Sequence, residues 1–269
     1  MIENIERIEH VDLIFEDVKF ASNSAIRLKI LATLFNEPQN MKELTENTGL
    51  SYSSVSSNMH ILELKNFIYR EHNRYFLTNS AKVRIQNMLE FNGVLMLIND
   101  FFNILVNHTV DMIPIESVSE IYLLRDADLM ESSGVDAYRT YNFIDKCLSM
   151  AGGVKCVLPF YYEPFFKSLD ELISKNRDVE LFVPEAVFEI LEDTTVIDNV
   201  TSFDESNVFL LIITDQVMIF GLFLDDGFFD KNRLIVSKNK NSILWADNLF
   251  ENFKKRYVKW VLDSFIIFF

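Results

Sequence analysis

The side chains best suited to chemistry in this chain are four histidines, two cysteines and 40 acidic residues. Neither the histidines, at positions 10, 60, 72 and 108, nor Cys147 and Cys156 have the spacing of a metal or redox site. The sequence also has no glycine-rich phosphate loop, Gly-x-Ser-x-Gly elbow or His-x-Lys pair. We therefore expect a protein that is not an enzyme and that uses no metal and no cofactor.

A serine-rich segment from Ser51 to Lys65 has the residue types for binding nucleic acid. As a helix, it would place Val55, Met59 and Leu62 on a buried face and its hydroxyl groups on the opposite face. Short hydroxyl side chains let a helix approach the major groove and donate to phosphates or base edges. No Arg, Gln or Lys precedes Lys65 in this segment, so direct base readout should be modest. The DNA contacts expected here are Tyr52, Ser53, Ser56, Ser57 and His60.

A hairpin-like pair of segments follows, Phe67–Arg70 and Tyr75–Thr78. Two arginines flank its turn, a position from which they could reach a phosphate or a minor groove. Charged hairpin tips are often simply solvated, and that alternative stays open. The contacts expected from the hairpin are Arg70, His72, Arg74 and Tyr75.

The residues before these segments supply the elements that would position them. Ser24–Phe35 and Met41–Thr48 have helical patterns and are separated by the polar break Asn36–Asn40. Gly49-Leu50 makes a tight turn before the serine-rich segment. The order of elements over residues 22–82 indicates a winged helix-turn-helix DNA-binding domain. It consists of two helices, a turn, a third helix and a hairpin.

Charge is distributed unevenly along the chain. The formal net charge is −15, yet residues 22–84 hold eight Lys or Arg against five Asp or Glu, which is a net charge of +3. Phosphate binding depends on local Lys and Arg, so this segment could bind DNA, while the acidic remainder would repel DNA held at the wrong angle.

The N-terminal motifs resemble a known class of proteins. Four motifs are similar to the helices and wing of archaeal winged-helix regulators of the ArsR-like class. They are Ser24-x-x-Arg27-x-x-Ile30-Leu31, Leu50–Val55, Leu62–Ile68 and Leu77-Thr-x-x-Ala81. Two positions depart from the usual glycines, with Asn66 after the recognition helix and Ala81 after the wing. After glycine, asparagine is the residue that best tolerates the left-handed conformation, so the resemblance still implies the winged-helix fold.

The remaining sequence divides into four segments, which together with the winged helix give an α+β protein. Residues 1–21 indicate an amphipathic helix. Residues 83–113 are too apolar for a one-sided surface helix and favour a linker that also forms a homodimer, with a monomer core helix as the alternative. Residues 114–257 alternate between strand and helix patterns, and the apolar runs at 207–213 and 217–224 suggest a hairpin buried on both faces. The tail, residues 258–269, is expected to dock on the protein.

The C-terminal half also resembles a family. Four segments are similar to the C-terminal domain of methanogenesis-type regulators, which are archaeal proteins that pair a winged helix with an acidic α/β domain. The segments are Val154–Phe160, Val179–Phe182, Gly221–Asp230 and Leu244–Phe250. The resemblance covers nearly the whole chain and implies that this domain senses an effector.

An aromatic cluster marks the candidate effector site. Phe160, Tyr161 and Tyr162 follow a strand end, where ligands of open α/β sheets commonly bind. Tyr161, Tyr162 and Arg233 are the residues expected to make polar contacts with a small molecule. Ordinary core packing of the aromatic cluster is the alternative interpretation.

These patterns predict a dimeric, cytoplasmic transcriptional regulator that binds double-stranded DNA and responds to an unknown effector. No signal peptide is visible and no run of about 18 apolar residues exists, so we expect no membrane segment. The alternative is a protein-interaction adaptor that uses the winged helix as a docking surface.

Overall fold

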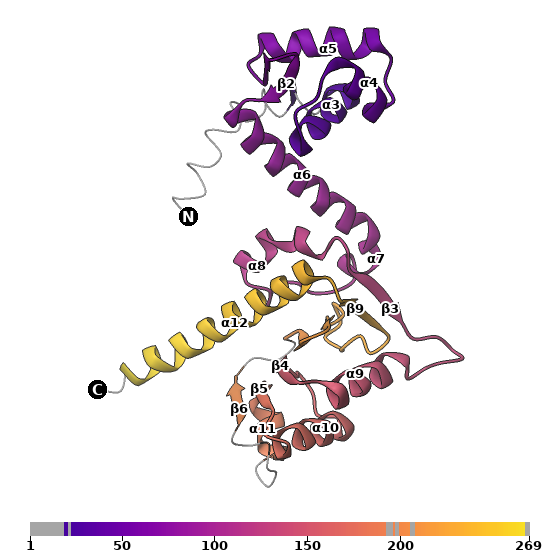
Figure 1. The fold of residues 1–269 in the computed structure, drawn as a ribbon. Helices are drawn as coiled ribbons and strands as arrows, with labels where there is room; N and C mark the ends of the chain where they lie inside the picture. Colours follow the sequence, from indigo (N-terminus) through magenta and orange to yellow (C-terminus); the bar gives the residue numbers. More distant parts are fainter. Residues whose placement is uncertain (1–18, 21–22, 192–195, 197–198, 205–207, 267–269) are drawn as a thin grey trace. The chain divides into compact units, whose positions relative to one another are not determined.

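The computed structural model describes residues 19–20, 23–191, 196, 199–204 and 208–266, with side chains described as far as residue 256. The chain divides into two compact units, Met1–Asn92 and Gly93–Phe269. Figure 1 shows the elements of each unit in sequence colours. Almost all of the amphipathic helix expected over residues 1–21 lies outside the described residues. The same holds for the side chains of the expected tail, residues 258–269.

The N-terminal unit consists of three helices, a two-stranded antiparallel hairpin and the start of a longer helix. Its elements are α3 (Ala25–Asn36), α4 (Met41–Thr48), α5 (Tyr52–Leu64), β1 (Ile68–Glu71), β2 (Arg74–Leu77) and α6 (Asn79–Asp100). This order agrees with the helices and hairpin expected from the sequence.

Local capping interactions set where these helices begin and end. The Ser24 hydroxyl accepts a hydrogen bond from the Arg27 backbone N–H at the start of α3. Asn40 and Glu43 form a reciprocal capping box at the start of α4. Gly49 ends α4 with a φ of 65°, a left-handed conformation that glycine adopts without steric cost.

One hydrophobic core joins the elements of the N-terminal unit. Ile30, Leu44 and Leu62 are fully buried and come from α3, α4 and α5, respectively. Ile85 of α6 is buried in the same core, so the first turns of α6 belong to this unit. The three helices are therefore held by shared burial of their apolar faces rather than by helix propensity.

The C-terminal unit is built on a mixed sheet. Among the described residues, seven strands lie in the order β3-β9-β8-β7-β4-β5-β6. β5 pairs in parallel with both β4 and β6, and the other neighbours are antiparallel. The strands are β3 (Asp128–Glu131), β4 (Gly153–Val157), β5 (Asp178–Pro184), β6 (Val200–Phe203), β7 (Leu210–Thr214), β8 (Met218–Gly221) and β9 (Arg233–Ser237).

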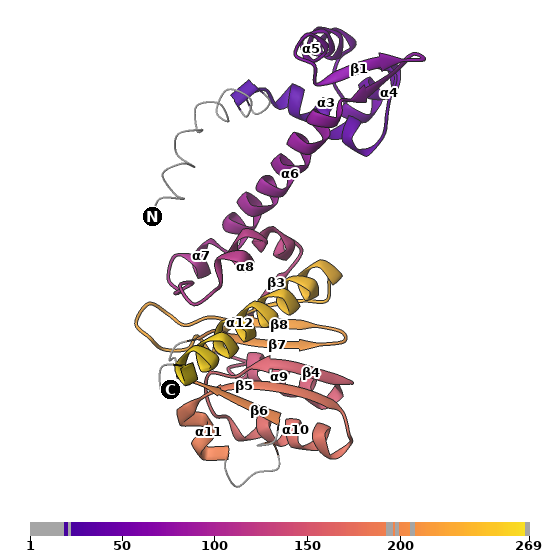
Figure 2. The same ribbon diagram turned by 90° about the vertical axis from the view of Figure 1, so that its left-hand side faces the viewer.

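Helices cover both faces of this sheet, and each face has its own core. The helices are α9 (Arg139–Met150), α10 (Glu163–Ser174), α11 (Glu185–Leu191) and α12 (Lys240–Ile266). Cys156 and Ile212 pack with α9 and α10, whereas their neighbours Val157 and Leu211 pack with α12. Figure 2 shows α12 on one face and α9 and α10 on the other. This burial on both faces agrees with the continuous apolar runs of β7 and β8.

The helix expected over residues 83–113 has different bounds in the structure. α6 ends at Asp100 and is followed by the short helix α7 (Phe102–Leu105). Phe101 lies between them and is buried with Leu97 and Ile104. The chain turns at Phe101 because all three side chains pack into the core of the C-terminal unit.

Other parts of the C-terminal unit carried no clear sequence signal. The elements α8 (Ile115–Ser119), η1 (Ile121–Leu124), α9, β3 and β9 were not expected from the sequence. The backbone of α12 continues into the expected tail and ends at Ile266. In the part of the chain that the structure describes, no helix is both long and apolar enough to cross a membrane.

Candidate nucleic-acid interface

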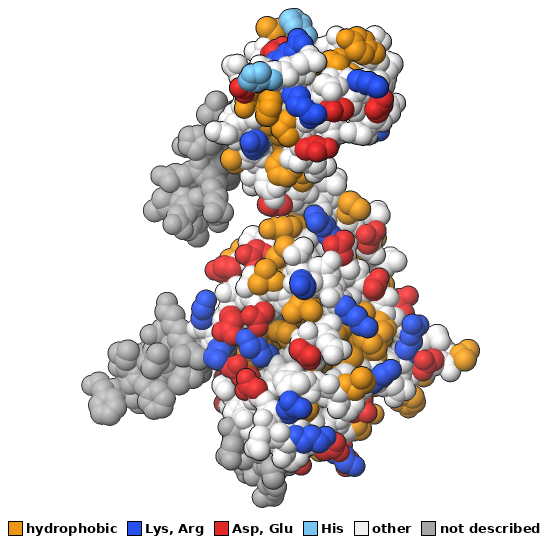
Figure 3. All heavy atoms as spheres, in the orientation of Figure 1, with side chains coloured by type: hydrophobic (Ala, Val, Ile, Leu, Met, Phe, Trp, Pro, Cys, Tyr) orange, Lys and Arg blue, Asp and Glu red, His pale blue; other side chains and the backbone are white. Residues whose placement is uncertain are grey.

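The outer face of α5 consists mainly of small polar side chains. Val55, Met59 and Leu62 point into the core, as the helical spacing predicts. The candidate residues Tyr52, Ser53, Ser56, Ser57 and His60 are all exposed. Figure 3 shows histidine and basic side chains close together on the visible face of the unit. α5 therefore presents a surface of hydroxyl groups that a partner could approach closely.

Hydrogen bonds within α5 determine which polar groups remain available. The Ser51 hydroxyl caps the helix by accepting from the Ser54 N–H at 3.3 Å. The Ser57 hydroxyl donates to the Ser54 carbonyl oxygen at 3.2 Å, and the Asn58 amide donates to the same oxygen at 2.8 Å. Asn58 is the side chain of α5 best suited to bidentate base contact, but it is half-buried and bonded within the helix. Base recognition by this surface would therefore depend on hydroxyl groups.

The hairpin has a tight two-residue turn. His72 and Asn73 have φ values of 44° and 66°, and positive values at both positions are characteristic of a type I′ turn. The Arg70 guanidinium donates to the Asn73 side-chain oxygen at 2.6 Å and lies 5.6 Å from the centre of the Tyr75 ring. Arg70 is exposed, so its charge can reach a partner beside α5.

Arg74 makes contacts within the unit that the sequence did not suggest. Its guanidinium donates to the Pro38 carbonyl oxygen at 2.6 Å and to the Glu43 carboxylate at 2.9 Å. Tyr75 of the same strand donates its backbone N–H to the Gln39 carbonyl oxygen at 2.8 Å. Arg74 thus attaches the hairpin to the segment before α4. Sequence reasoning missed this contact because the two residues of the ion pair lie 31 positions apart.

The candidate effector residues lie in two different environments. Tyr161 stacks on Phe166 with ring centres 5.0 Å apart, and Tyr162 packs edge-on against Phe165 at 4.7 Å. Arg233 donates to the Asp230 carboxylate at 2.6 Å. Among the described residues, no hydrogen bond or ring contact joins Arg233 to either tyrosine.

Arg233 belongs to a buried polar network at the start of β9. The His108 ring lies between two acceptors, with Nδ1 2.7 Å from the Ile104 carbonyl oxygen and Nε2 2.9 Å from the Asp230 carboxylate. Burial acts to raise the pKa of Asp230, but hydrogen bonds from Asn232, His108 and Arg233 outweigh it and hold that pKa below its usual value. In this network the Arg233 guanidinium is already bonded within the fold.

The described residues contain no group of three or more His, Cys, Asp or Glu side chains placed to hold a metal ion. Cys156 is fully buried and Cys147 is half-buried, and both are free thiols. Burial raises the pKa of both groups.

Two solved structures are similar to this chain at low scores. One is described as "Structure of TrmBL2, an archaeal chromatin protein, shows a novel mode of DNA binding"; it is 12% identical, covers 92% of this chain and 98% of that chain, and has a TM-score of 0.39. The other is a putative O-methyltransferase from Nostoc punctiforme, 14% identical over 72% of this chain and 64% of that one, with a TM-score of 0.25. Neither similarity is close enough to support an argument about function.

Family comparisons give a more specific result. Residues 15–98 match the N-terminal domain of the methanogenesis regulatory protein FilR1, and residues 138–256 match its middle domain. FilR1 of Methanothrix harundinacea (strain 6Ac) is 21% identical over 253 residues, which cover 89% of this chain and 57% of FilR1. This chain thus spans little more than half the length of that relative. From these two matches, the chain carries the N-terminal and middle domains of the FilR1 family.

Proposed function

We propose that this protein is a transcriptional regulator whose N-terminal unit is a winged helix-turn-helix of the ArsR-like class that binds double-stranded DNA. The observation that carries the proposal is the exposed hydroxyl face of α5 next to a hairpin that presents Arg70. The name of the FilR1 relative, a methanogenesis regulatory protein, supports a regulatory role. The local net charge of +3 suits a phosphate-bearing partner.

The proposed binding mode follows from the two surfaces. α5 enters the major groove, where its serine hydroxyls approach phosphates and base edges. Arg70 contacts a phosphate or the adjacent minor groove. Arg74 contributes by holding the hairpin in place, because its guanidinium is already bonded to Glu43 and Pro38. Affinity then depends strongly on backbone contacts and should fall steeply with salt.

A homodimer would bring two such units to two half-sites, and α6 carries the features of a dimer interface. Phe91, Leu95 and Ile98 are spaced by four and three residues, which is the spacing of a coiled-coil seam. All three side chains are exposed, with Phe91 63%, Leu95 49% and Ile98 42% accessible. Contact with a second copy would remove this apolar surface from water.

In the same proposal the C-terminal unit senses a small-molecule effector. An effector regulates DNA binding if it favours one arrangement of the dimer over another. Tyr161, Tyr162 and Arg233 remain candidate contacts for it. Tyr161 is the most available of the three, because Arg233 is paired with Asp230 and Tyr162 packs against Phe165.

The decisive experiment measures DNA binding by fluorescence anisotropy at several salt concentrations. The duplex covers the region upstream of the protein's own gene, and a scrambled duplex of equal length is the reference. The variant Ser56→Glu with Ser57→Glu places negative charge on the outer face of α5 and should abolish binding. Ser174→Glu adds the same kind of charge at an exposed position of the C-terminal unit and should leave binding unchanged.

The outcome also separates the regulator from the adaptor alternative. A regulator binds the upstream duplex more tightly than the scrambled one and loses affinity as salt rises. An adaptor binds neither duplex at any salt concentration, and its α5 variant changes nothing. The second result would overturn the proposal.

A further inference from the structure

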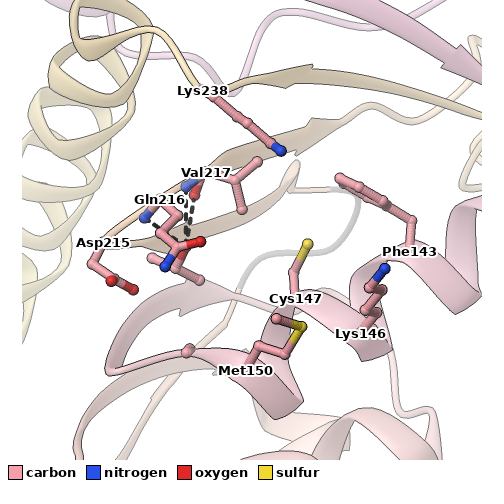
Figure 4. Close-up of a pocket in the computed structure, with 10 residues that line it drawn as sticks. Phe143, Lys146, Cys147, Met150, Asp215, Gln216, Val217 and Lys238 are labelled. Carbon is pink, nitrogen blue, oxygen red and sulfur yellow. Dashed lines mark hydrogen bonds between the residues drawn. The ribbon is translucent and has the colours of Figure 1, made fainter.

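A cavity of about 220 Å³ lies between α9 and the turn that joins β7 to β8. α9 contributes Phe143, Lys146, Cys147 and Met150 to its walls. The turn contributes Thr214 to Val217, and Lys238 follows directly after β9. Figure 4 shows the Cys147 thiol and the Lys238 ammonium directed toward the same space, with the Phe143 ring beside them.

The two lysines give this cavity a positive charge. Lys146 and Lys238 are both exposed, and no ion-pair partner for either is found in the described part of the chain. Both act electrostatically on the thiol of Cys147, which lines the same cavity. Two lysines that line one cavity and have no ion pair among the described residues favour an anion there.

One acidic residue, Asp215, also lines the cavity. The Asp215 carboxylate accepts a hydrogen bond from the Gly152 N–H at 3.4 Å. Figure 4 shows it on the far side of the cavity from Phe143. One oxygen of the carboxylate is therefore bonded to the chain that leads into β4.

Apart from the polar residues Thr214 and Gln216, the rest of the cavity wall is apolar. Phe143, Met150, Ala151 and Val217 line it together with the half-buried Cys147. Burial raises the pKa of the Cys147 thiol, while Lys238 and Lys146 act to lower it. A thiol with a raised pKa is neutral near neutral pH and does not compete for the two ammonium groups.

We propose that this cavity binds a small organic anion, in which a carboxylate or phosphate lies between Lys146 and Lys238 and a short apolar body contacts Phe143, Met150 and Val217. Such a combination of a few polar anchors with an apolar wall is typical of small-molecule sites. It is a second candidate effector site, separate from Tyr161, Tyr162 and Arg233, and in that role it deepens the proposed regulatory function and rests on it. The binding itself does not depend on DNA.

Cys147 provides a direct reporter of occupancy. Iodoacetamide reacts with the thiolate form of a cysteine. The thiol first loses its proton to the buffer. The thiolate sulfur then forms a bond to the carbon of iodoacetamide, and iodide leaves. Cys156 is fully buried and its pKa is strongly raised by burial, so labelling of the folded protein reports on Cys147. The probe ligand is phenyl phosphate, which carries both an anionic group and an apolar ring. Inorganic phosphate lacks the ring, and phenol lacks the charge.

The experiment measures the rate of Cys147 alkylation in the full chain by mass spectrometry, without DNA. Millimolar phenyl phosphate should slow alkylation, and neither phosphate nor phenol should match it. Lys146→Gln with Lys238→Gln should weaken this protection about tenfold, because it removes both ammonium groups. Lys167→Gln with Lys231→Gln removes two exposed charges elsewhere in the same unit and should preserve protection.

Three results would overturn the proposed site. They are no protection by phenyl phosphate, equal protection in the Lys146/Lys238 variant, or equal protection by phosphate or phenol. Failure of the regulatory proposal would give a different result from failure of this site. DNA binding would then be absent in the anisotropy experiment, while phenyl phosphate would still protect Cys147.

Discussion

Arg74 and Glu43 are joined by an ion pair of 2.9 Å that connects the hairpin to the start of α4. The second carboxylate oxygen of Glu43 accepts from the Asn40 backbone N–H at 3.0 Å and so completes the cap of that helix. One carboxylate therefore serves both the helix cap and the position of the hairpin. This arrangement gives the two arginines of the hairpin different partners, because Arg74 pairs with Glu43 and Arg70 with Asn73 of the turn.

The two arginines should respond differently to substitution. Arg74→Ala should lower the free energy of unfolding of the N-terminal unit by about 1 kcal/mol, because it removes a partly exposed ion pair and a hydrogen bond to a carbonyl group. Arg70→Ala should change that free energy by less than about 0.5 kcal/mol. Chemical denaturation monitored by circular dichroism measures both values.

DNA binding should show a separate effect of Arg70. Its removal should weaken binding across sequences and reduce the slope of log K against log salt by about 1, as expected for a lost phosphate contact. Arg70→Lys keeps the charge and is the matched control. An unchanged salt slope in Arg70→Ala would exclude Arg70 from the interface.

Substitution of Gly49 tests the conformation of the turn between α4 and α5. An added Cβ would meet nothing within 4 Å, but the φ of 65° would be strained in alanine. Gly49→Ala should therefore destabilise the unit by about 1 to 2 kcal/mol through the backbone alone. Gly49→Asn should recover part of this loss because asparagine tolerates the conformation better. Equal stability of the alanine variant and the unaltered protein would contradict this account.

The proposed dimer predicts a defined effect of charge on α6. Leu95→Glu with Ile98→Glu should weaken self-association by at least about tenfold, because it places charge in an apolar seam. Gln86→Glu adds charge to the same helix on the face opposite the seam and should have little effect. Sedimentation equilibrium measures the dissociation constant. A monomer at all concentrations before substitution would refute this mode of dimerisation.

The network around Asp230 predicts a pH-dependent contribution to stability. The pKa of Asp230 is lower in the folded chain than its ordinary value of 3.8, so its contribution is present above that value and is lost as pH falls through the folded pKa. Asp230→Asn should cost about 2 to 3 kcal/mol at neutral pH, since it leaves His108 and Arg233 without their carboxylate.

Unfolding measured across a pH series checks this prediction. The difference between Asp230→Asn and the unaltered protein should be constant near neutral pH and should shrink below about pH 4. The exposed Asp225→Asn is the matched control and should show no comparable loss. A difference that persists unchanged at low pH would mean that packing rather than charge is responsible.

Much of the N-terminal unit could be predicted because its signals are local. The hydroxyl of Ser24 caps α3 and that of Ser51 caps α5, each by accepting a hydrogen bond from three residues ahead. The burial of Val55, Met59 and Leu62 follows from helical spacing within one segment. The apolar runs of β7 and β8 likewise predicted a hairpin with both faces buried.

The remaining features depend on contacts between distant parts of the sequence. The strand order places β9 beside β3 and β8, and no local pattern specifies those neighbours. Arg233 was expected at a ligand site, yet the structure pairs it with Asp230 and places that carboxylate beside His108, 122 positions away. The cavity brings together Cys147, Gln216 and Lys238 from three separate elements.

The sequence by itself determined the helix caps, the two faces of α5 and the resemblance to regulators, because these depend on residues a few positions apart. Only the tertiary structure decided that Arg74 pairs with Glu43 and that Lys146 and Lys238 line one cavity. Such pairings are set by how complete elements pack to bury their apolar faces, and that packing is not encoded in the spacing of any single segment.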